Sequence, residues 1–329
     1  MRAVSLVEAE RLEVVDLPAP EAGAGELLLR VTACGICGSD LTSFKRGLFL
    51  GVPGHEVAGV VESVGAGVNG WRPGDAAVLL PGPGCGACDE CAAGAYHRCI
   101  ESLTGGGTTR PGGYAELMAA RAGQLRPVPD GLTPDVACLA EPLSVAIHGL
   151  RRVGQPRAEE AIVLGLGSLG LLAVAALRWL GASRVSGVDP VESRRALAAG
   201  LGAEAVFGRA SDARADLDGA PLVLECSGRP EALQQALDLA RPGGRVALLG
   251  IAVAEVTVIP VFWITREITV TGSINSRVED FEEALRLLAA RPGVAGIVTR
   301  RVGLEEVPAT FQELLHPTGV GKVVIDPRR

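Results

Sequence analysis

Aromatic residues and lysine are scarce in this sequence, and long apolar runs are missing. Only 3% of the 329 residues are aromatic whereas 48% are hydrophobic, so the core must be built from alanine, valine, leucine and isoleucine. The formal net charge of −7 provides no basic surface for nucleic acid. Because no run approaches the roughly 20 apolar residues that a membrane span needs, we expect neither a transmembrane helix nor a membrane partner.

The first residues of the sequence also lack the pattern of an export signal. The first 15 residues carry five charged side chains and no apolar core stretch. Eight cysteines in a chain without such a signal indicate reduced thiols and bound metal rather than disulfides. We therefore expect a cytoplasmic protein.

Length and pattern predict two domains of the α/β class. A chain of 329 residues is too long for one ordinary core. Its first part contains short apolar or alternating runs bounded by glycine and proline, which predict strands. From about Glu141, helical patterns alternate with apolar runs, as in a parallel sheet covered by helices on both faces. We predict a β-rich domain (residues 1–142 and 275–329) and a doubly wound nucleotide-binding domain (residues 143–274).

The same patterns place individual elements. The predicted strands span residues 4–6, 27–31, 57–64, 76–80, 161–164, 184–188, 222–225, 246–249, 268–271 and 322–325. The predicted helices span residues 169–180, 192–201, 230–239 and 278–290.

Four cysteines form the clearest metal-binding motif. Cys85, Cys88, Cys91 and Cys99 follow a C-x2-C-x2-C-x7-C pattern in a stretch without helical or strand periodicity. Four thiolates suit a tetrahedral structural zinc ion, which needs no open ligand position. The alternatives are two disulfides or four free thiols, and disulfides are rare in cytosolic chains.

A second metal site is predicted upstream of the first. Cys37 and His55 offer a thiolate and an imidazole, and Glu56 or the distant Glu141 offers a carboxylate. A catalytic zinc ion takes three such mixed ligands and keeps a fourth position open for water or substrate. The alternative is a redox pair of Cys34 and Cys37, but that motif belongs at the start of a helix in a βαβ unit, which is absent here.

A glycine-rich motif predicts a dinucleotide site. Residues 165–170, Gly-Leu-Gly-Ser-Leu-Gly, follow a predicted strand and lead into a predicted helix. Gly165 permits a tight turn, Gly167 lets the backbone approach a pyrophosphate, and Gly170 lets helix and strand pack closely. The phosphates would lie at the helix N-terminus, at Ser168 and Leu169, where unpaired amides and the helix dipole favour anions.

Asp189 strengthens the dinucleotide prediction. It ends the next predicted strand, 19 residues after Gly170, where an acid can bind both ribose hydroxyls of NAD and repel the 2′-phosphate of NADP. Arg194 lies nearby and weakens this preference. Alternatively, Asp189 caps the helix that begins near Val191. The pattern favours NAD over NADP.

The order of these motifs resembles the zinc-containing medium-chain alcohol dehydrogenases, of the branch that includes sorbitol, threonine and butanediol dehydrogenases. The resemblance covers essentially the whole chain and implies a GroES-like β-rich domain, a Rossmann-type NAD-binding domain, and a homodimer or homotetramer. It is carried by Cys34–Asp40, Gly54–Gly65, Pro73–Asp75, the four-cysteine segment, Glu141–Pro142, the glycine-rich motif and the turn Glu225–Gly228.

The resemblance also implies the metal ligands and one further cofactor contact. Cys37 and His55, with either Glu56 or Glu141, would hold the catalytic zinc ion. The two glutamates would exchange as the open position fills. Ser227, in the turn after a strand of the nucleotide-binding domain, would contact the cofactor.

Three residues near the expected substrate cleft complete the comparison with the family. Asp40 would orient a zinc ligand, and Ser39 would contact the zinc-bound alcohol and begin a proton relay. Thr42 departs from the pattern, because relatives often carry there the histidine that passes the proton onward. The segment between Asp40 and His55 is also several residues shorter than usual in the family. The resemblance therefore does not imply a particular substrate for this chain.

These features predict the reversible oxidation of a secondary alcohol, in a polyol, sugar or amino alcohol, to a ketone. Hydride would pass to NAD, with one catalytic and one structural zinc ion per chain. The alternatives are an NADP(H)-dependent biosynthetic reductase of the same family and a non-catalytic nucleotide or metal sensor. Other histidines and cysteines have no such setting and are expected to be structural: His97, His148, His316, Cys138 and Cys226.

Overall fold

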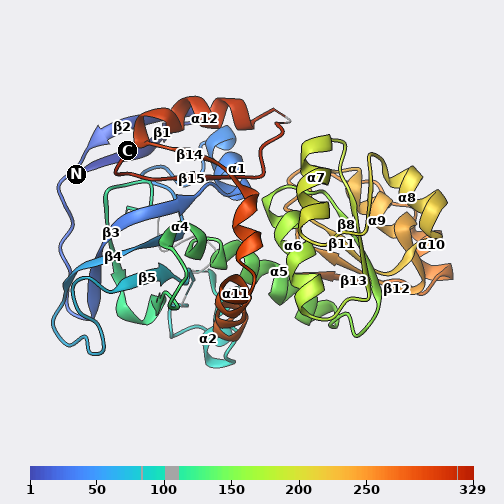
Figure 1. Ribbon diagram of the computed structural model, residues 1–329, viewed down its shortest axis with the longest axis horizontal. Coiled ribbons are helices and arrows are strands. Elements are labelled where there is room, and N and C mark those ends of the chain that lie inside the picture. The colour runs from blue at the N-terminus through green and yellow to red at the C-terminus, as the bar shows by residue number, and fades with distance from the viewer. Residues whose placement is uncertain (83, 101–110, 317) are drawn as a thin grey trace.

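The computed structural model describes residues 1–82, 84–100, 111–316 and 318–329. Two sheet-based bodies lie side by side, and the helices α5 (Ala140–Val153) and α11 (Val278–Ala290) stand between them (Figure 1). Both chain ends lie in the first body (Figure 1). This arrangement confirms the predicted α/β fold class.

The first body is built on a mixed, seven-stranded sheet. Its strand order is β14-β15-β3-β4-β5-β7, and β6 also pairs with β3. The strands are β3 (Glu26–Gly35), β4 (Glu56–Val64), β5 (Ala76–Leu79), β6 (Leu117–Arg121), β7 (Leu125–Pro127), β14 (Val298–Val302) and β15 (Lys322–Ile325). A separate hairpin joins β1 (Arg2–Glu8) to β2 (Arg11–Asp16). The last strand, β15, pairs antiparallel with the end of β3, so the C-terminal segment returns to the first body.

The second body contains a six-stranded parallel sheet in the order β10-β9-β8-β11-β12-β13. The strands are β8 (Glu160–Leu164), β9 (Arg184–Val188), β10 (Ala205–Phe207), β11 (Ala220–Glu225), β12 (Ala240–Leu248) and β13 (Thr269–Gly272). The intervening helices are α6 (Ser168–Trp179), α7 (Glu192–Gly200), α8 (Ala210–Leu217), α9 (Ala232–Leu239) and α10 (Pro260–Thr265).

Each predicted strand and helix coincides with an element of the structure, although β3 and β12 extend further than predicted. The largest buried cluster consists mainly of alanine, valine, leucine and isoleucine, and Phe281 is its only fully buried aromatic residue among those described. This confirms the core composition expected from the scarcity of aromatic residues. No helix in the described part of the chain is both long and apolar enough to cross a bilayer.

Seven of the described α-helices were not predicted: α1 (Gly38–Arg46), α2 (Asp89–Ala92), α4 (Pro134–Ala137), α5, α8, α10 and α12 (Val307–Leu314). Most side chains of α5 are buried, including Glu141 and His148, so the helix lacks the polar stripe that makes periodicity visible. The predicted domain boundary at residue 142 lies inside this continuous helix.

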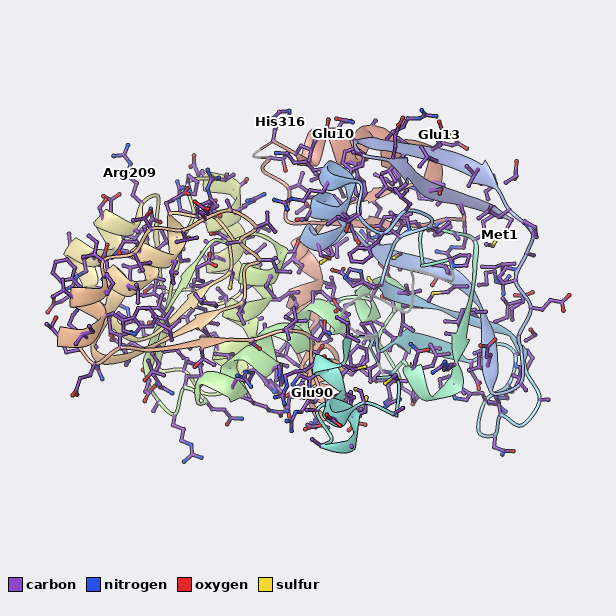
Figure 2. The ribbon with its side chains drawn as sticks, turned by 180° about the vertical axis from the view of Figure 1, so that it is seen from behind. Met1, Glu10, Glu13, Glu90, Arg209 and His316 are labelled. Carbon is purple, nitrogen blue, oxygen red and sulfur yellow. The ribbon has the colours of Figure 1, made fainter. Side chains whose placement is uncertain are left out.

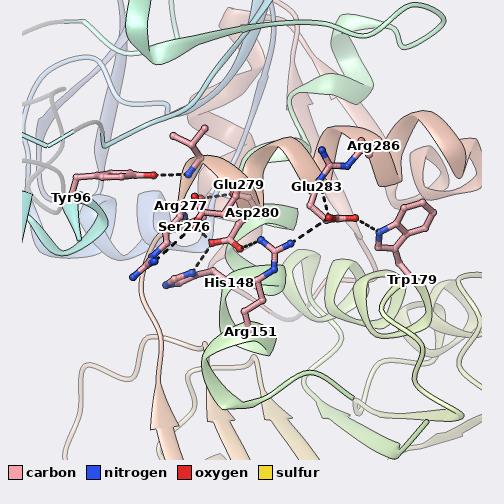
Figure 3. Close-up of polar contacts among 12 residues, drawn as sticks. Tyr96, His148, Arg151, Trp179, Ser276, Arg277, Glu279, Asp280, Glu283 and Arg286 are labelled. Carbon is pink, nitrogen blue, oxygen red and sulfur yellow. Dashed lines mark hydrogen bonds and ion pairs between the residues drawn. The ribbon is translucent and has the colours of Figure 1, made fainter. Parts of the chain in front are cut away.

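A buried polar network fastens α5 to α11 between the two bodies (Figure 3). Asp280 accepts hydrogen bonds from Arg151 (2.5 Å) and from the backbone amide of Arg277 (3.0 Å), and it bonds to Nδ1 of His148 (2.7 Å). The amide of Val278 donates to the hydroxyl of Tyr96 (2.7 Å). The segment around the four cysteines is thereby tied to the N-terminus of α11.

Candidate functional site

Cys37, His55 and Glu56 meet at one edge of the mixed sheet. Cys37 is the N-cap of α1, which follows β3, whereas His55 precedes β4 and Glu56 begins it. The register between β3 and β4 pairs Gly35 with Glu56, so the end of one strand lies beside the start of the other. One ligand atom from each of the three side chains lies within 4.8 Å of the others. A thiolate, an imidazole and a carboxylate at this spacing fit a zinc ion with one open position.

Lys322 is a further charged residue at this centre, and no sequence motif marked it. Its Nζ donates to Oε1 of Glu56 (2.6 Å) and to the carbonyl of Ile36 (2.8 Å). Lys322 is 1% exposed and Glu56 is 0% exposed. Burial disfavours the ammonium, but the charge of Glu56 outweighs it and raises the pKa of Lys322. Gly35 makes room for the pair, because a Cβ there would lie 1.8 Å from Glu56 Oε2.

Asp40 lies beside the imidazole of His55, and Tyr114 in turn bonds to Asp40. Oδ1 of Asp40 lies 3.5 Å from Nδ1 of His55, and Oδ2 accepts hydrogen bonds from the amide of Cys37 (3.0 Å) and the hydroxyl of Tyr114 (2.6 Å). Asp40 is buried, which by itself would raise its pKa, yet His55 and these donors lower it. The predicted orienting position of Asp40 is therefore observed, and Tyr114 is an additional partner that no sequence motif marked.

Glu141 lies outside the group formed by Cys37, His55 and Glu56. It stands in the first turn of α5 and is buried. Burial, with the negative charge of Glu56, raises the pKa of Glu141 to about 7, although the positive charge of His55 opposes the shift. Both glutamates thus belong to one electrostatic cluster, but only Glu56 is within ligand distance of Cys37 and His55.

The remaining residues of this region occupy different positions. Ser39 is half-buried in the first turn of α1. The hydroxyl of Thr42 donates to the carbonyl of Gly38 (3.3 Å), so it is engaged by the helix backbone. Cys34 is a free, fully buried thiol inside β3, and burial raises its pKa well above the usual value. A buried strand thiol is a poor redox nucleophile.

The four cysteines of the second motif lie together in a separate segment. The sulfur atoms of Cys85, Cys88, Cys91 and Cys99 all lie within 4.8 Å of one another. The amide of Cys85 donates to the sulfur of Cys99 (3.4 Å), and Gly84 has φ +81°, where an added Cβ would be 2.5 Å from the sulfur of Cys91. Four cysteines around one point, none of them in a disulfide, suit a closed tetrahedral zinc site.

The glycine-rich motif forms the turn between β8 and α6. Gly165 has φ +89°, and a Cβ there would lie 2.6 Å from Cβ of Ser227. A Cβ on Gly170 would lie 1.8 Å from the carbonyl of Gly165, whereas one on Gly167 would meet nothing within 4 Å. Open space therefore lies in front of the backbone at the N-terminus of α6, where amides can bind a pyrophosphate.

Neighbouring side chains shape this turn. The hydroxyl of Ser168 donates to the carbonyl of Gly321 (2.7 Å), and the side chain of Leu169 is half-buried. Glu225 accepts hydrogen bonds from the amides of Ser227 (2.6 Å) and Gly228 (3.0 Å), which holds Ser227 beside Gly165.

Asp189 follows β9 and is buried against the turn. Its Oδ2 accepts a hydrogen bond from the amide of Leu166 (2.8 Å), and its Oδ1 accepts one from the amide of Val191 (2.8 Å). Arg194 Nη1 lies 3.8 Å from Oδ2. Asp189 therefore fastens the glycine-rich turn and supports the start of α7, as the capping alternative required. Each oxygen keeps lone pairs that can accept a ribose hydroxyl.

The other histidines and cysteines are placed as follows. His97 and His148 are buried and their rings contact each other, whereas His316 is exposed on the surface (Figure 2). Cys138 is a buried free thiol, and Cys226 is a partly buried one.

Comparisons with known proteins agree with this geometry. Residues 23–130 match the alcohol dehydrogenase GroES-like domain, and residues 168–290 match the zinc-binding dehydrogenase family. The chain is 32% identical to L-threonine 3-dehydrogenase from Anaeromyxobacter dehalogenans, over 98% of both proteins. It is 29% identical to sorbitol dehydrogenase from Bacillus subtilis, over 100% of this chain and 98% of that protein.

A solved structure from Sinorhizobium meliloti 1021, described as a zinc-binding dehydrogenase and bound to NADP, has the same fold. It aligns with a TM-score of 0.89 and 30% identity over 99% of both chains. The resemblance inferred from the motifs is confirmed: the chain belongs to the zinc-type, medium-chain alcohol dehydrogenase family of oxidoreductases.

Proposed function

We propose that the protein reversibly oxidises a secondary alcohol, in a polyol, sugar or amino alcohol, to a ketone with NAD as hydride acceptor. The observation that carries this proposal is the mixed donor set of Cys37, His55 and Glu56 in the same chain as a dinucleotide-type turn. Relatives named for L-threonine and sorbitol support a hydroxyl-bearing, polar substrate.

Several residues of the chain would have separate roles around the metal and the cofactor. Zinc would lower the pKa of a bound hydroxyl and stabilise the alkoxide, while NAD would take the hydride. Cys37 and His55 would bind the metal, and Asp40 would keep Nδ1 of His55 engaged so that Nε2 faces the ion. Ser39 would contact the alcohol, and Glu141, with a pKa of about 7, can hold or release a proton at its carboxyl group near neutral pH.

Glu56 is our proposed third ligand before substrate binds. Its ligand atom lies within reach of Cys37 and His55, whereas Glu141 lies farther away. The ammonium of Lys322 already bonds to Glu56, so a carboxylate released from the metal keeps a buried partner of opposite charge. This supports an exchange in which Glu56 leaves as the open position fills and Glu141 approaches.

Two further assignments complete the proposal. The four-cysteine segment would bind a second, structural zinc ion, because its ligand set is closed and lies apart from the first cluster. NAD would be preferred because Asp189 places a carboxylate at the end of β9, where it disfavours a 2′-phosphate. The NADP-bound relative and the nearby Arg194 make the NADP(H)-dependent reductase the second candidate.

The protein would pair with a second copy through the nucleotide-binding domain. β13 is an edge strand of the parallel sheet, and the adjacent α10 exposes Val261, Phe262 and Ile264. An edge strand beside exposed apolar side chains suits edge-to-edge pairing about a two-fold axis. Light scattering after size-exclusion chromatography should show a dimer or tetramer that Ile264→Glu weakens. A monomeric wild-type protein at micromolar concentration would contradict this.

The proposed reaction is tested by assaying zinc-replete protein for NAD+ and NADP+ reduction across polyols, sugars, vicinal diols, amino alcohols and simple alcohols. We expect turnover with NAD+ on one polyhydroxylated or amino-alcohol class. Absence of turnover with every alcohol, despite bound zinc and measurable NAD affinity, would instead favour the sensor.

The cofactor preference is tested by Asp189→Ser. We expect NAD to bind at least about tenfold more weakly, which corresponds to the loss of about 1.4 kcal/mol of binding energy. Because Asp189 also binds the amides of Leu166 and Val191, Tm should be measured alongside. Unchanged NAD affinity in a folded variant, or a wild type that prefers NADPH, would favour the reductase.

A further inference from the structure

A pocket of about 330 Å³ lies between the four-cysteine segment, the C-terminal half of α5 and the carboxyl end of β13. Its lining includes four basic or imidazole side chains, from Arg98, Arg152, His97 and His148, together with Ser273. None of its lining residues belongs to the candidate zinc centres or to the glycine-rich motif. The pocket is therefore a separate feature of the junction between the two bodies.

Three buried polar atoms around this pocket have no hydrogen-bond partner within the described residues. They are Nδ1 of His97, Nε2 of His148 and the hydroxyl oxygen of Ser273. His97 is 1% exposed and His148 is 4% exposed, and their ring centroids lie 4.7 Å apart. An unpaired buried polar group costs about 1–3 kcal/mol, so three of them lining one cavity indicate a polar occupant.

The orientation of His148 is fixed by its neighbours. Its Nδ1 lies 2.7 Å from Oδ2 of Asp280, which also accepts hydrogen bonds from Arg151 and the amide of Arg277 (Figure 3). A carboxylate accepts hydrogen bonds, so Nδ1 of His148 carries a proton and donates it to Asp280. The unpaired Nε2 lies on the opposite edge of the ring from Asp280.

The charges around the pocket favour an anion over a metal cation. The guanidinium groups of Arg98 and Arg152 line it, and none of its described lining residues carries a carboxylate. The nearby carboxylates are already engaged: Glu90 pairs with Arg98 (2.6 Å), Glu279 lies 3.7 Å from Arg277, and Asp280 holds the far edge of His148. A bound cation would therefore meet the guanidinium groups of Arg98 and Arg152 without a free carboxylate among the described lining residues.

Arg152 is the principal free charge at the pocket. Its Nε donates to the carbonyl of Gly272 (3.0 Å), which anchors the guanidinium at the end of β13. Among the described residues Arg152 forms no ion pair, so its remaining N–H groups can bind a ligand. A guanidinium fork matches two oxygens of a phosphate or carboxylate.

We propose that this pocket binds a phosphate group, as inorganic phosphate or as the monoester of a small metabolite. Arg152 would bind two oxygens, Arg98 would add a second positive charge, and the hydroxyl of Ser273 would donate a hydrogen bond. The imidazole of His97 can donate from Nδ1. Because the donors come from three separate elements, an acceptor with several oxygens in different directions suits them better than a planar carboxylate. The bound group would brace the four-cysteine segment against α5 and β13.

Calorimetry with inorganic phosphate tests the proposal on zinc-replete protein. Saturating NAD would cover the amides at the N-terminus of α6. A constant ionic strength, set with chloride, would remove non-specific salt effects. We expect saturable binding of one phosphate per chain, at least tenfold weaker in Arg152→Gln and several-fold weaker in Ser273→Ala. Ser273→Ala removes an unpaired hydroxyl, so the variant should fold normally.

Arg209→Gln is the matched control, because it makes the same charge change on the exposed surface of the second body (Figure 2). It should leave phosphate affinity unchanged. Methyl phosphate separates the two sources: equal or tighter binding indicates a metabolite monoester, and tenfold weaker binding indicates free phosphate. No saturable binding to the wild type, or equal affinity in Arg152→Gln, Ser273→Ala and the wild type, would overturn the proposal.

Discussion

The two candidate metal centres differ in how the fold assembles them. The four cysteines come from one short segment whose turns and sulfur-directed amides bring them together locally. Cys37, His55 and Glu56 instead meet because β3 and β4 pair in a particular register, and Lys322 arrives from the last strand. A closed site can be formed by a segment alone. The site with the open position depends on the whole sheet and on buried charges of opposite sign.

The surroundings of the two centres differ as well. Within the described residues 84–100, no carboxylate or ammonium is buried, and Cys85 is exposed. Around Cys37 and His55 stand the buried groups Asp40, Glu141 and Lys322. Buried charges are expensive unless they are paired, and they cluster where chemistry requires a particular protonation state. The contrast explains why one centre is assigned to stability and the other to catalysis.

The largest expected effect is the loss of chemistry when Cys37 is replaced by serine. Turnover should fall by at least about 10³-fold, because zinc would lose its thiolate and the stabilisation of the alkoxide. NAD affinity, measured by fluorescence titration, should stay within about twofold, since the glycine-rich turn lies in the other domain. Undiminished turnover in a zinc-free preparation of this variant would contradict the catalytic assignment.

Cys91→Ser should produce the opposite pattern. The free energy of unfolding should fall by several kcal/mol, because structural zinc contributes about 10–16 kcal/mol of binding energy in zinc-finger peptides. Turnover per folded molecule should change little. Chemical denaturation and active-site titration measure the two quantities, and a well-folded variant that lost only turnover would reverse the comparison.

Lys322→Met sharpens the comparison by leaving Glu56 buried without its ammonium partner. In zinc-free protein we expect a loss of about 3–5 kcal/mol of unfolding free energy. In zinc-replete protein the loss should be smaller, because the metal itself pairs with Glu56. Lys45→Met is the matched control: Lys45 is the only other lysine, is exposed, and should change stability by less than about 0.5 kcal/mol.

An equal loss from Lys322→Met with and without zinc would show that Glu56 is not shared between the metal and the ammonium. The experiment therefore separates a structural ion pair from a partner of the metal ligand.

The smallest expected effect is that of Tyr114→Phe. Removing the hydroxyl deletes one hydrogen bond to the Asp40 carboxylate (2.6 Å) and should cost about 1.5–3 kcal/mol of stability or less. Zinc affinity at the Cys37 centre should weaken by no more than about tenfold, since Tyr114 acts on the ligand His55 through Asp40. Competition with a chelator measures this affinity. If Tyr114→Phe lost more zinc affinity than Asp40→Asn, the proposed order of contacts, from Tyr114 through Asp40 to His55, would be contradicted.

Sequence patterns predicted most of the described strands, some of the helices and the metal-ligating residue types because those signals are local. The apolar run of β8 followed by the glycine-rich turn, and the spacing of the four cysteines, can each be recognised within a short window. The missed residues act over long separations: Lys322 is 266 positions from Glu56, and Tyr114 is 74 positions from Asp40. Only the folded sheet brings these partners together.

Helix α5 was missed for a different reason. Its buried faces leave no alternation of apolar and polar residues, so its polar members look like isolated exceptions in an apolar stretch. Glu141 was named from the sequence as an alternative carboxylate ligand to Glu56, and its placement outside the Cys37 group required the three-dimensional structure. His148 gained a partner in Asp280 only through the packing of α5 against α11.

The most direct test of two independent centres is the zinc content per chain of the wild type and the two cysteine variants. Elemental analysis should find two zinc ions in the wild type and one in Cys37→Ser, with the remaining ion resistant to mild chelation. Folded Cys91→Ser should also contain one zinc ion per chain, because only the four-cysteine site should lose its metal. One zinc ion in the wild type, or the loss of both ions in well-folded Cys37→Ser, would contradict the account.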